Sequence, residues 1–105
     1  MTTVLIPLCT VNTVPEGEAT KAHLPDGTAL ALFNVGGRIY ATSDVCTHGE
    51  VSLSEEGNFS GITVECGWHF GTFDVTTGEA TGSPCTQDLR TYHVTIIEGV
   101  IHVSA

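Results

Sequence analysis

The chain has 105 residues, of which 41% are hydrophobic and 14% are charged, a composition typical of a single globular domain rather than a disordered chain. Its formal net charge of -9 disfavours binding to nucleic acid or to an anionic membrane, because both repel an acidic protein. No apolar run approaches the roughly 18 residues that a membrane-spanning helix requires.

Glycine-rich turns separate short runs of apolar and β-branched residues, and no segment shows a sustained helical period. This pattern predicts an all-β fold. In the first part of the chain, Pro25-Asp26-Gly27 and Gly36-Gly37 mark two hairpin turns. The strands predicted there are 4–8, 19–24, 28–35 and 38–42.

The sequence changes character between residues 43 and 84, where loops lengthen and only short strands are predicted, at 62–65 and 72–75. Regular alternation returns over 89–97, and a last strand over 100–103 is expected to pair with the opening strands. We therefore expect one domain, 1–105. An antiparallel sandwich or barrel-like base would be formed by 1–42 and 85–105, with an inserted subdomain at about 43–84.

The start of the chain, residues 1–7, contains no basic residue, and its apolar run is shorter than the core of a signal peptide. We therefore expect a cytoplasmic protein. Thiols stay reduced in that compartment, so cysteines that lie near histidines in the sequence indicate a metal site or catalysis more than disulfides.

Two short motifs carry the candidate ligands: Cys46-Thr47-His48 and Cys66-Gly67-Trp68-His69, with 17 residues between His48 and Cys66. Each motif offers one thiolate and one imidazole. Because each pair is close in sequence, one loop can present both donors to the same site, and two neighbouring loops would supply four ligands.

These motifs resemble those of the Rieske proteins, in which two histidines replace two cysteines on one iron of a [2Fe-2S] cluster. The resemblance implies a Rieske fold, with Cys46 and Cys66 on one iron and His48 and His69 on the other. It covers nearly the whole chain, including Gly82-Ser83-Pro84, which is similar to the proline-containing third loop of the family.

The resemblance is greatest to the small ferredoxins of bacterial aromatic-ring-hydroxylating dioxygenases. It implies a one-electron carrier without catalytic residues of its own, and a monomer. Its expected partners are an NADH-oxidising, flavin-containing reductase and a terminal oxygenase.

The resemblance also implies a low reduction potential. High-potential Rieske proteins have a disulfide between the two cluster loops, where this chain has Val51 and Trp68. They also have a serine and a tyrosine whose hydroxyl groups donate to cluster sulfurs, where this chain has Gly71 and Phe73. Without these donors the reduced cluster is less stabilised.

Two alternatives remain open at this point: the small Rieske-like subunit of an assimilatory nitrite reductase, and a zinc-stabilised interaction module. The Cys-x-His spacing is unusual for zinc sites, whose paired ligands are usually two to four residues apart. A cysteine-protease-like dyad is disfavoured, because two Cys/His pairs are redundant for a single nucleophile.

The remaining cysteines and histidines are not expected to bind metal, because none has a partner at ligand spacing. They are Cys9, Cys85, His23, His93 and His102. Trp68 is expected to shield the cluster from water. Glu50, Glu55 and Glu56 are either an acidic docking rim or an ordinary solvated loop.

Overall fold

The computed structural model describes residues 4–46, 51–66, 71–82 and 87–104. Within them the chain is mainly antiparallel β-structure in three sheets, which confirms the predicted fold class. The first sheet has the strand order β1 (Leu5–Thr10), β11 (Val100–Ser104), β10 (Val94–Ile97). The second has the order β2 (Ala19–His23), β3 (Ala29–Val35), β4 (Arg38–Ser43), β9 (Thr91–Tyr92). The third has the order β5 (Asn58–Ser60), β6 (Thr63–Glu65), β7 (Thr72–Asp74), β8 (Ala80–Gly82).

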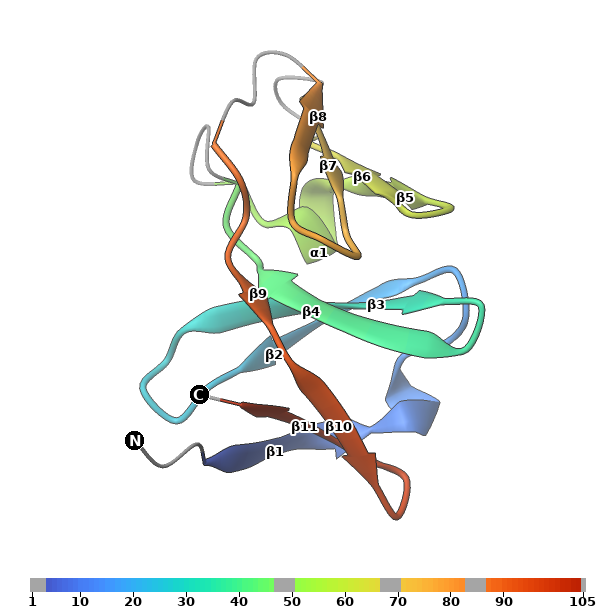
Figure 1. Ribbon diagram of the computed structural model, residues 1–105, viewed down its shortest axis with the longest axis vertical. Helices are drawn as coiled ribbons and strands as arrows, with labels where there is room; N and C mark the ends of the chain where they lie inside the picture. The colour runs from blue at the N-terminus through green and yellow to red at the C-terminus, as the bar shows by residue number, and fades with distance from the viewer. Residues whose placement is uncertain (1–3, 47–50, 67–70, 83–86, 105) are drawn as a thin grey trace.

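The three sheets follow one another along the long axis of the molecule (Figure 1). The third sheet and the short helix α1 (Leu53–Glu56) lie at one end, the first sheet lies at the other, and the second sheet lies between them. A single 3-10 turn, η1 (Val11–Thr13), follows β1. No helix among the described residues is both long and apolar enough to cross a membrane.

Strand β3 holds the layers together because both of its faces are buried. Leu30 and Leu32 belong to a core shared with the first sheet, whereas Ala31 and Phe33 belong to a second core shared with the third sheet. Side chains alternate between the faces of a strand, so four consecutive apolar residues serve two cores. The ring of Phe33 packs against that of Phe59 on β5, with centroids 5.0 Å apart.

The hairpins predicted from the glycine turns are present, and β11 pairs with β1 at the opening of the chain as expected. The single strand predicted over 89–97 is wrong. The segment divides at His93 into β9, which pairs with β4, and β10, which pairs with β11. The alternating pattern continues across this division because the chain passes directly from one sheet to the other.

The sequence did not predict the short elements α1, β5 and β8. Helix α1 is a single turn, and β5 and β8 have three residues each. Elements of this length contain too few residues to establish a period. The predicted division of the chain at residues 43 and 84 stays a prediction, although all four strands of the third sheet lie between those residues.

Gly78, in the turn after β7, lies in close contact with Leu89 of the segment that precedes β9. Its φ is +80°, and a Cβ there would lie 2.5 Å from the carbonyl oxygen of Leu89. The backbone N–H of Leu89 donates to the carbonyl of Gly78 at 2.7 Å. Gly27 also has a positive φ, but nothing lies within 4 Å of its Cβ position.

We therefore predict that Gly78→Ala destabilises the protein more than Gly27→Ala. Both substitutions introduce the cost of a left-handed backbone, about 1–2 kcal/mol. Only Gly78→Ala adds a steric clash, worth about 1–3 kcal/mol more. Denaturant unfolding of the two variants measures the difference, and equal destabilisation would show that this close contact does not exist.

Candidate metal centre

The two candidate cysteine ligands described by the structure lie in the same hydrophobic core. Cys46 comes three residues after β4, and Cys66 directly follows β6. Their exposed fractions are only 2% and 0%, and both belong to the core that includes Leu53, Val64 and Phe73. The hairpin of β5 and β6 lies between the two cysteines in the sequence, yet both thiols lie in the same apolar core.

Each cysteine begins a loop that is closed in the same way. The backbone N–H of Cys46 donates to the carbonyl of Val51 at 3.0 Å, and that of Cys66 donates to the carbonyl of Gly71 at 2.7 Å. The residues enclosed by these bonds, 47–50 and 67–70, lie outside the described residues. His48 and His69 are among them, so the structure does not test their role as ligands.

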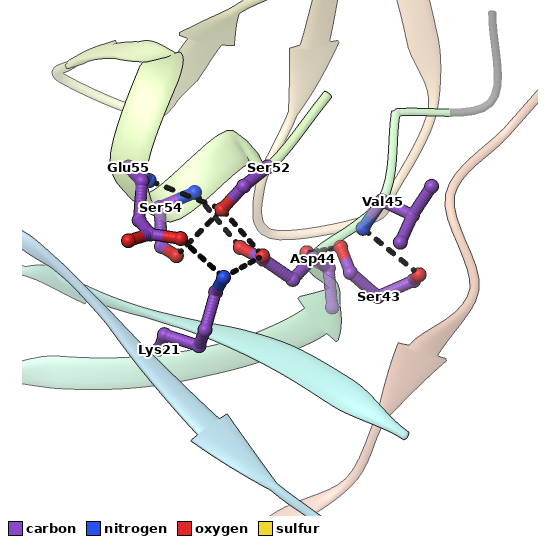
Figure 2. A network of polar contacts seen from close by, with 8 residues as sticks. Lys21, Ser43, Asp44, Val45, Ser52, Ser54 and Glu55 are labelled. Atoms are coloured by element: carbon purple, nitrogen blue, oxygen red, sulfur yellow. Dashed lines mark hydrogen bonds and ion pairs between the residues drawn. The ribbon is translucent and has the colours of Figure 1, made fainter. Parts of the chain in front are cut away.

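The first of these loops is supported by Asp44, whose carboxylate is 1% exposed. Its Oδ2 accepts the hydroxyl hydrogen of Ser52 at 2.6 Å, and its Oδ1 accepts the backbone N–H of Ser54 at 2.8 Å (Figure 2). Its backbone carbonyl accepts the N–H of Leu53 at 2.7 Å. Val45 and Ser52 also form a β-bridge. The residues on both sides of the loop are therefore joined to each other.

The same contacts begin helix α1. Ser52 is its N-cap, and the Ser52 hydroxyl accepts the N–H of Glu55 at 3.3 Å. Asp44 accepts the N–H of Ser54, another amide of the first turn that has no partner within the helix. The sequence Ser52-x-x-Glu55 is a capping-box pattern, the one sequence signal that could have predicted this helix.

Lys21 on β2 brings a positive charge to this carboxylate. Its Nζ lies 3.5 Å from Oδ2 of Asp44 and also pairs with Glu55 (Figure 2). The hydrogen bond to Glu55 raises the pKa of Lys21, and the same bond lowers the pKa of Glu55 below the ordinary glutamate value of 4.5. The ion pair therefore contributes stability at neutral pH that is lost as the pH falls through the lowered pKa of Glu55.

Glu55 is thus not an isolated negative charge, which weakens its case as part of an acidic docking rim. Glu50 lies outside the described residues, and the rim stays a prediction. Cys85 also lies outside the described residues, as does Trp68, which is expected to shield the cluster.

The residues that follow the second loop have no hydroxyl group at positions 71 and 73, the two positions at which a hydroxyl donor would raise the reduction potential. Gly71 contributes its backbone carbonyl to the loop closure, and the ring of Phe73 is fully buried in the core with the two cysteines. Val51 is buried at the end of the first loop.

The other described cysteine and histidines lie in or beside strands of the first two sheets. Cys9 on β1 is half-buried against the core of the first sheet. His23 ends β2, His93 joins β9 to β10, and His102 lies on β11 with its Nδ1 3.0 Å from the carbonyl oxygen of Val100. Among the described residues, no group of three Cys, His, Asp or Glu side chains could hold a metal ion.

A hollow of about 700 Å³ is lined by residues of the second sheet, among them Arg38, Tyr40 and Tyr92, and also by Ile96 of the first sheet and by Val75, which follows β7. Neither Cys46 nor Cys66 lines it. Val75 belongs to the same core as the two cysteines, so the hollow borders that core without including either cysteine in its lining.

The comparisons with known proteins identify the family of the chain. The model of the Rieske [2Fe-2S] domain family matches residues 4–93. The chain belongs to the Rieske family. Its cofactor is therefore a Rieske-type [2Fe-2S] cluster, and the zinc-module alternative is excluded. Two buried thiols in one core, each beginning a loop that also contains a histidine, fit the two-Cys, two-His ligand set of such a cluster.

Two proteins similar to this Rieske protein over most of their length are ferredoxins. The ferredoxin component of the p-cumate 2,3-dioxygenase system of Pseudomonas putida is 50% identical to it, over 94% of this chain and 84% of the relative. The Sphingomonas yanoikuyae B1 ferredoxin has a TM-score of 0.92 and 36% identity, over 97% and 99% of the two chains. These relatives are electron-transfer components and not catalytic subunits.

Two further structures bear on partners and alternatives. A chain in the complex of reduced oxygenase and oxidised ferredoxin of carbazole 1,9a-dioxygenase has a TM-score of 0.89 and 37% identity, over 96% and 93% of the two chains. A putative nitrite reductase small subunit from Mycobacterium tuberculosis has a TM-score of 0.83 but only 20% identity. The latter likeness shows the shared fold alone, so the nitrite reductase alternative is the weaker one.

Proposed function

We propose that this Rieske protein is the one-electron carrier of a multicomponent aromatic-ring-hydroxylating dioxygenase. It would accept electrons from an NADH-oxidising flavoprotein reductase in the cytoplasm and deliver them to a terminal oxygenase. The observation that carries this proposal is the pair of buried thiols on two equivalently closed loops. The proposal is further supported by a ferredoxin relative of such a system, matched over 94% of the chain.

Within this proposal, Cys46 and Cys66 bind one iron, and His48 and His69 bind the other. The two thiols are buried and lie at the starts of their loops. The two histidines follow them by two and three residues in the sequence. The region of about 43–84 is then the cluster-binding subdomain, and the first two sheets form its base.

The bound cluster supplies reversible one-electron chemistry. Two ferric ions, two sulfides and two thiolates sum to zero charge, so adding an electron costs less than it would with four thiolates. The chain's own contribution is to keep water away from the thiolates, since Cys46 and Cys66 are almost fully buried.

The docking surface is proposed to lie at the end of the molecule that bears the third sheet, because electron transfer slows steeply with distance. Val45 directly precedes the first ligand, and 47% of it is exposed, although it is apolar. An exposed apolar residue next to the ligand is suited to the centre of an interface, where water is excluded. The proposed partner at this surface is the terminal oxygenase.

The first prediction from the proposed function tests the ligands. Cys66→Ser and His48→Ala should each abolish the normal cluster and destabilise the fold, because metal-binding free energy is part of the folding free energy of small metal sites. Cys9→Ser is the matched control and should keep two irons and two acid-labile sulfides per chain. Iron and sulfide analysis decides the matter, and a full cluster in the Cys66 variant would refute the assignment.

The second prediction tests the docking surface. Val45→Asn should lower the second-order rate of electron delivery to the oxygenase by about fivefold, as expected for losing about 1 kcal/mol of apolar burial. Ile96→Asn on β10 is the control, because Ile96 is 46% exposed but lies in the first sheet. Stopped-flow kinetics at equal cluster content compares the variants, and equal rates would place the contact elsewhere.

The third prediction concerns the reduction potential, which should lie near the lower end of the Rieske range, roughly -150 mV. Hydroxyl donors to sulfur stabilise the reduced cluster, and positions 71 and 73 have none. Gly71→Ser combined with Phe73→Tyr should raise the potential, provided that the hydroxyls reach the sulfurs. Protein-film voltammetry measures both proteins, and a wild-type midpoint well above 0 mV would contradict the prediction.

A further inference from the structure

Asp44 is an acidic residue that is buried in the interior. Electron transfer itself does not require a buried carboxylate. Among the described residues, it and Thr42 are the only polar residues buried in the interior. Removing a carboxylate from water is costly unless donors surround it. Here both oxygens are used, by the Ser52 hydroxyl and the Ser54 amide, and Lys21 supplies a compensating charge.

The contacts of Asp44 reach three successive residues across the loop. Its side chain holds Ser52 and Ser54, and its backbone carbonyl holds Leu53 between them. Its own N–H donates to the carbonyl of Ala29 on β3 at 3.1 Å. Asp44 therefore ties the far side of the loop to the second sheet, as Figure 2 shows for its side chain.

Cys46 lies only two residues beyond Asp44, and the intervening Val45 is bridged to Ser52. The next contact along the same two segments is the closure between Cys46 and Val51. A displacement of Ser52 or Leu53 would thus be passed directly to the backbone of Cys46. A buried carboxylate of this kind can fix one geometry more firmly than an apolar contact, because its partners must align with its oxygens.

We propose that Asp44 is a positioning residue for the cluster, which sets the geometry of the Cys46 loop by fixing the first turn of α1 against β3 and Lys21. The proposal rests on the ligand role of Cys46 given under the proposed function. It goes beyond that role, because Asp44 acts through the backbone on either side of the loop and is not a ligand.

The test compares three holoprotein variants with the wild type. Asp44→Asn keeps the shape but removes one acceptor oxygen and the charge, so Ser52 or Ser54 loses its partner. Ser52→Ala is a milder change that keeps the carboxylate and removes the hydroxyl donor. Asp26→Asn is the matched control, since Asp26 also accepts a backbone N–H, from Thr28 at 2.9 Å, but in the exposed turn between β2 and β3.

Three quantities are measured: the rate of iron release to a chelator, the EPR g-values of the reduced cluster, and its midpoint potential. We expect Asp44→Asn to release iron at least tenfold faster than the wild type, with shifted g-values and potential. Ser52→Ala should change all three in the same direction by less. Asp26→Asn should stay within twofold of the wild-type rate and keep its spectrum.

The proposal is overturned if Asp44→Asn retains the wild-type release rate, g-values and potential, even where its melting temperature falls, because the residue would then only stabilise the fold. Should Asp44→Asn fail to fold, the same criteria apply to Ser52→Ala. Failure of the proposed function would look different: the wild type would keep two irons, two sulfides and a Rieske spectrum but would not deliver electrons to a terminal oxygenase. A wrong ligand assignment would instead appear as a full cluster in the Cys66→Ser variant.

Discussion

The buried carboxylate of Asp44 is the interaction through which the second sheet, helix α1 and the first cysteine loop are connected. Four hydrogen bonds and one ion pair converge on this residue, from β3, from the first turn of α1 and from Lys21 on β2. Its burial is tolerated because each oxygen has a donor and a cation lies close by. Cys46, two residues further on, therefore leaves the base of the molecule in a defined direction.

Packing makes the second connection between the base and the cysteines. Strand β3 contributes Leu30 and Leu32 to one core and Ala31 and Phe33 to the core that contains Cys46 and Cys66. The sheet that packs against the core of the two cysteines is thus also the middle one of the three sheets (Figure 1). A one-electron carrier needs no substrate pocket at its metal site, and neither Cys46 nor Cys66 lines the surface hollow that includes Arg38 and Tyr92.

The sequence predicted most of what local patterns can determine. Turn glycines and period-two alternation indicated the β2–β3–β4 hairpins, and the two Cys/His motifs indicated the cofactor. The switch between sheets at His93 could not be predicted, because alternation is the same whichever sheet a strand joins. Asp44 was missed because a lone acidic residue carries no signal of burial, and its partners Lys21 and Ser54 are distant or unremarkable in sequence. The Ser52-x-x-Glu55 capping box was a readable signal for α1.

The most direct test of the account is whether two histidine nitrogens bind the cluster. The protein can be produced with ¹⁵N-labelled histidine, reduced by one electron and studied by electron–nuclear double resonance. The account predicts couplings from two inequivalent histidine nitrogens, with one of them lost in any cluster that His48→Ala still assembles. A reduced wild-type cluster without histidine nitrogen couplings would contradict it, because neither His48 nor His69 would then bind the cluster.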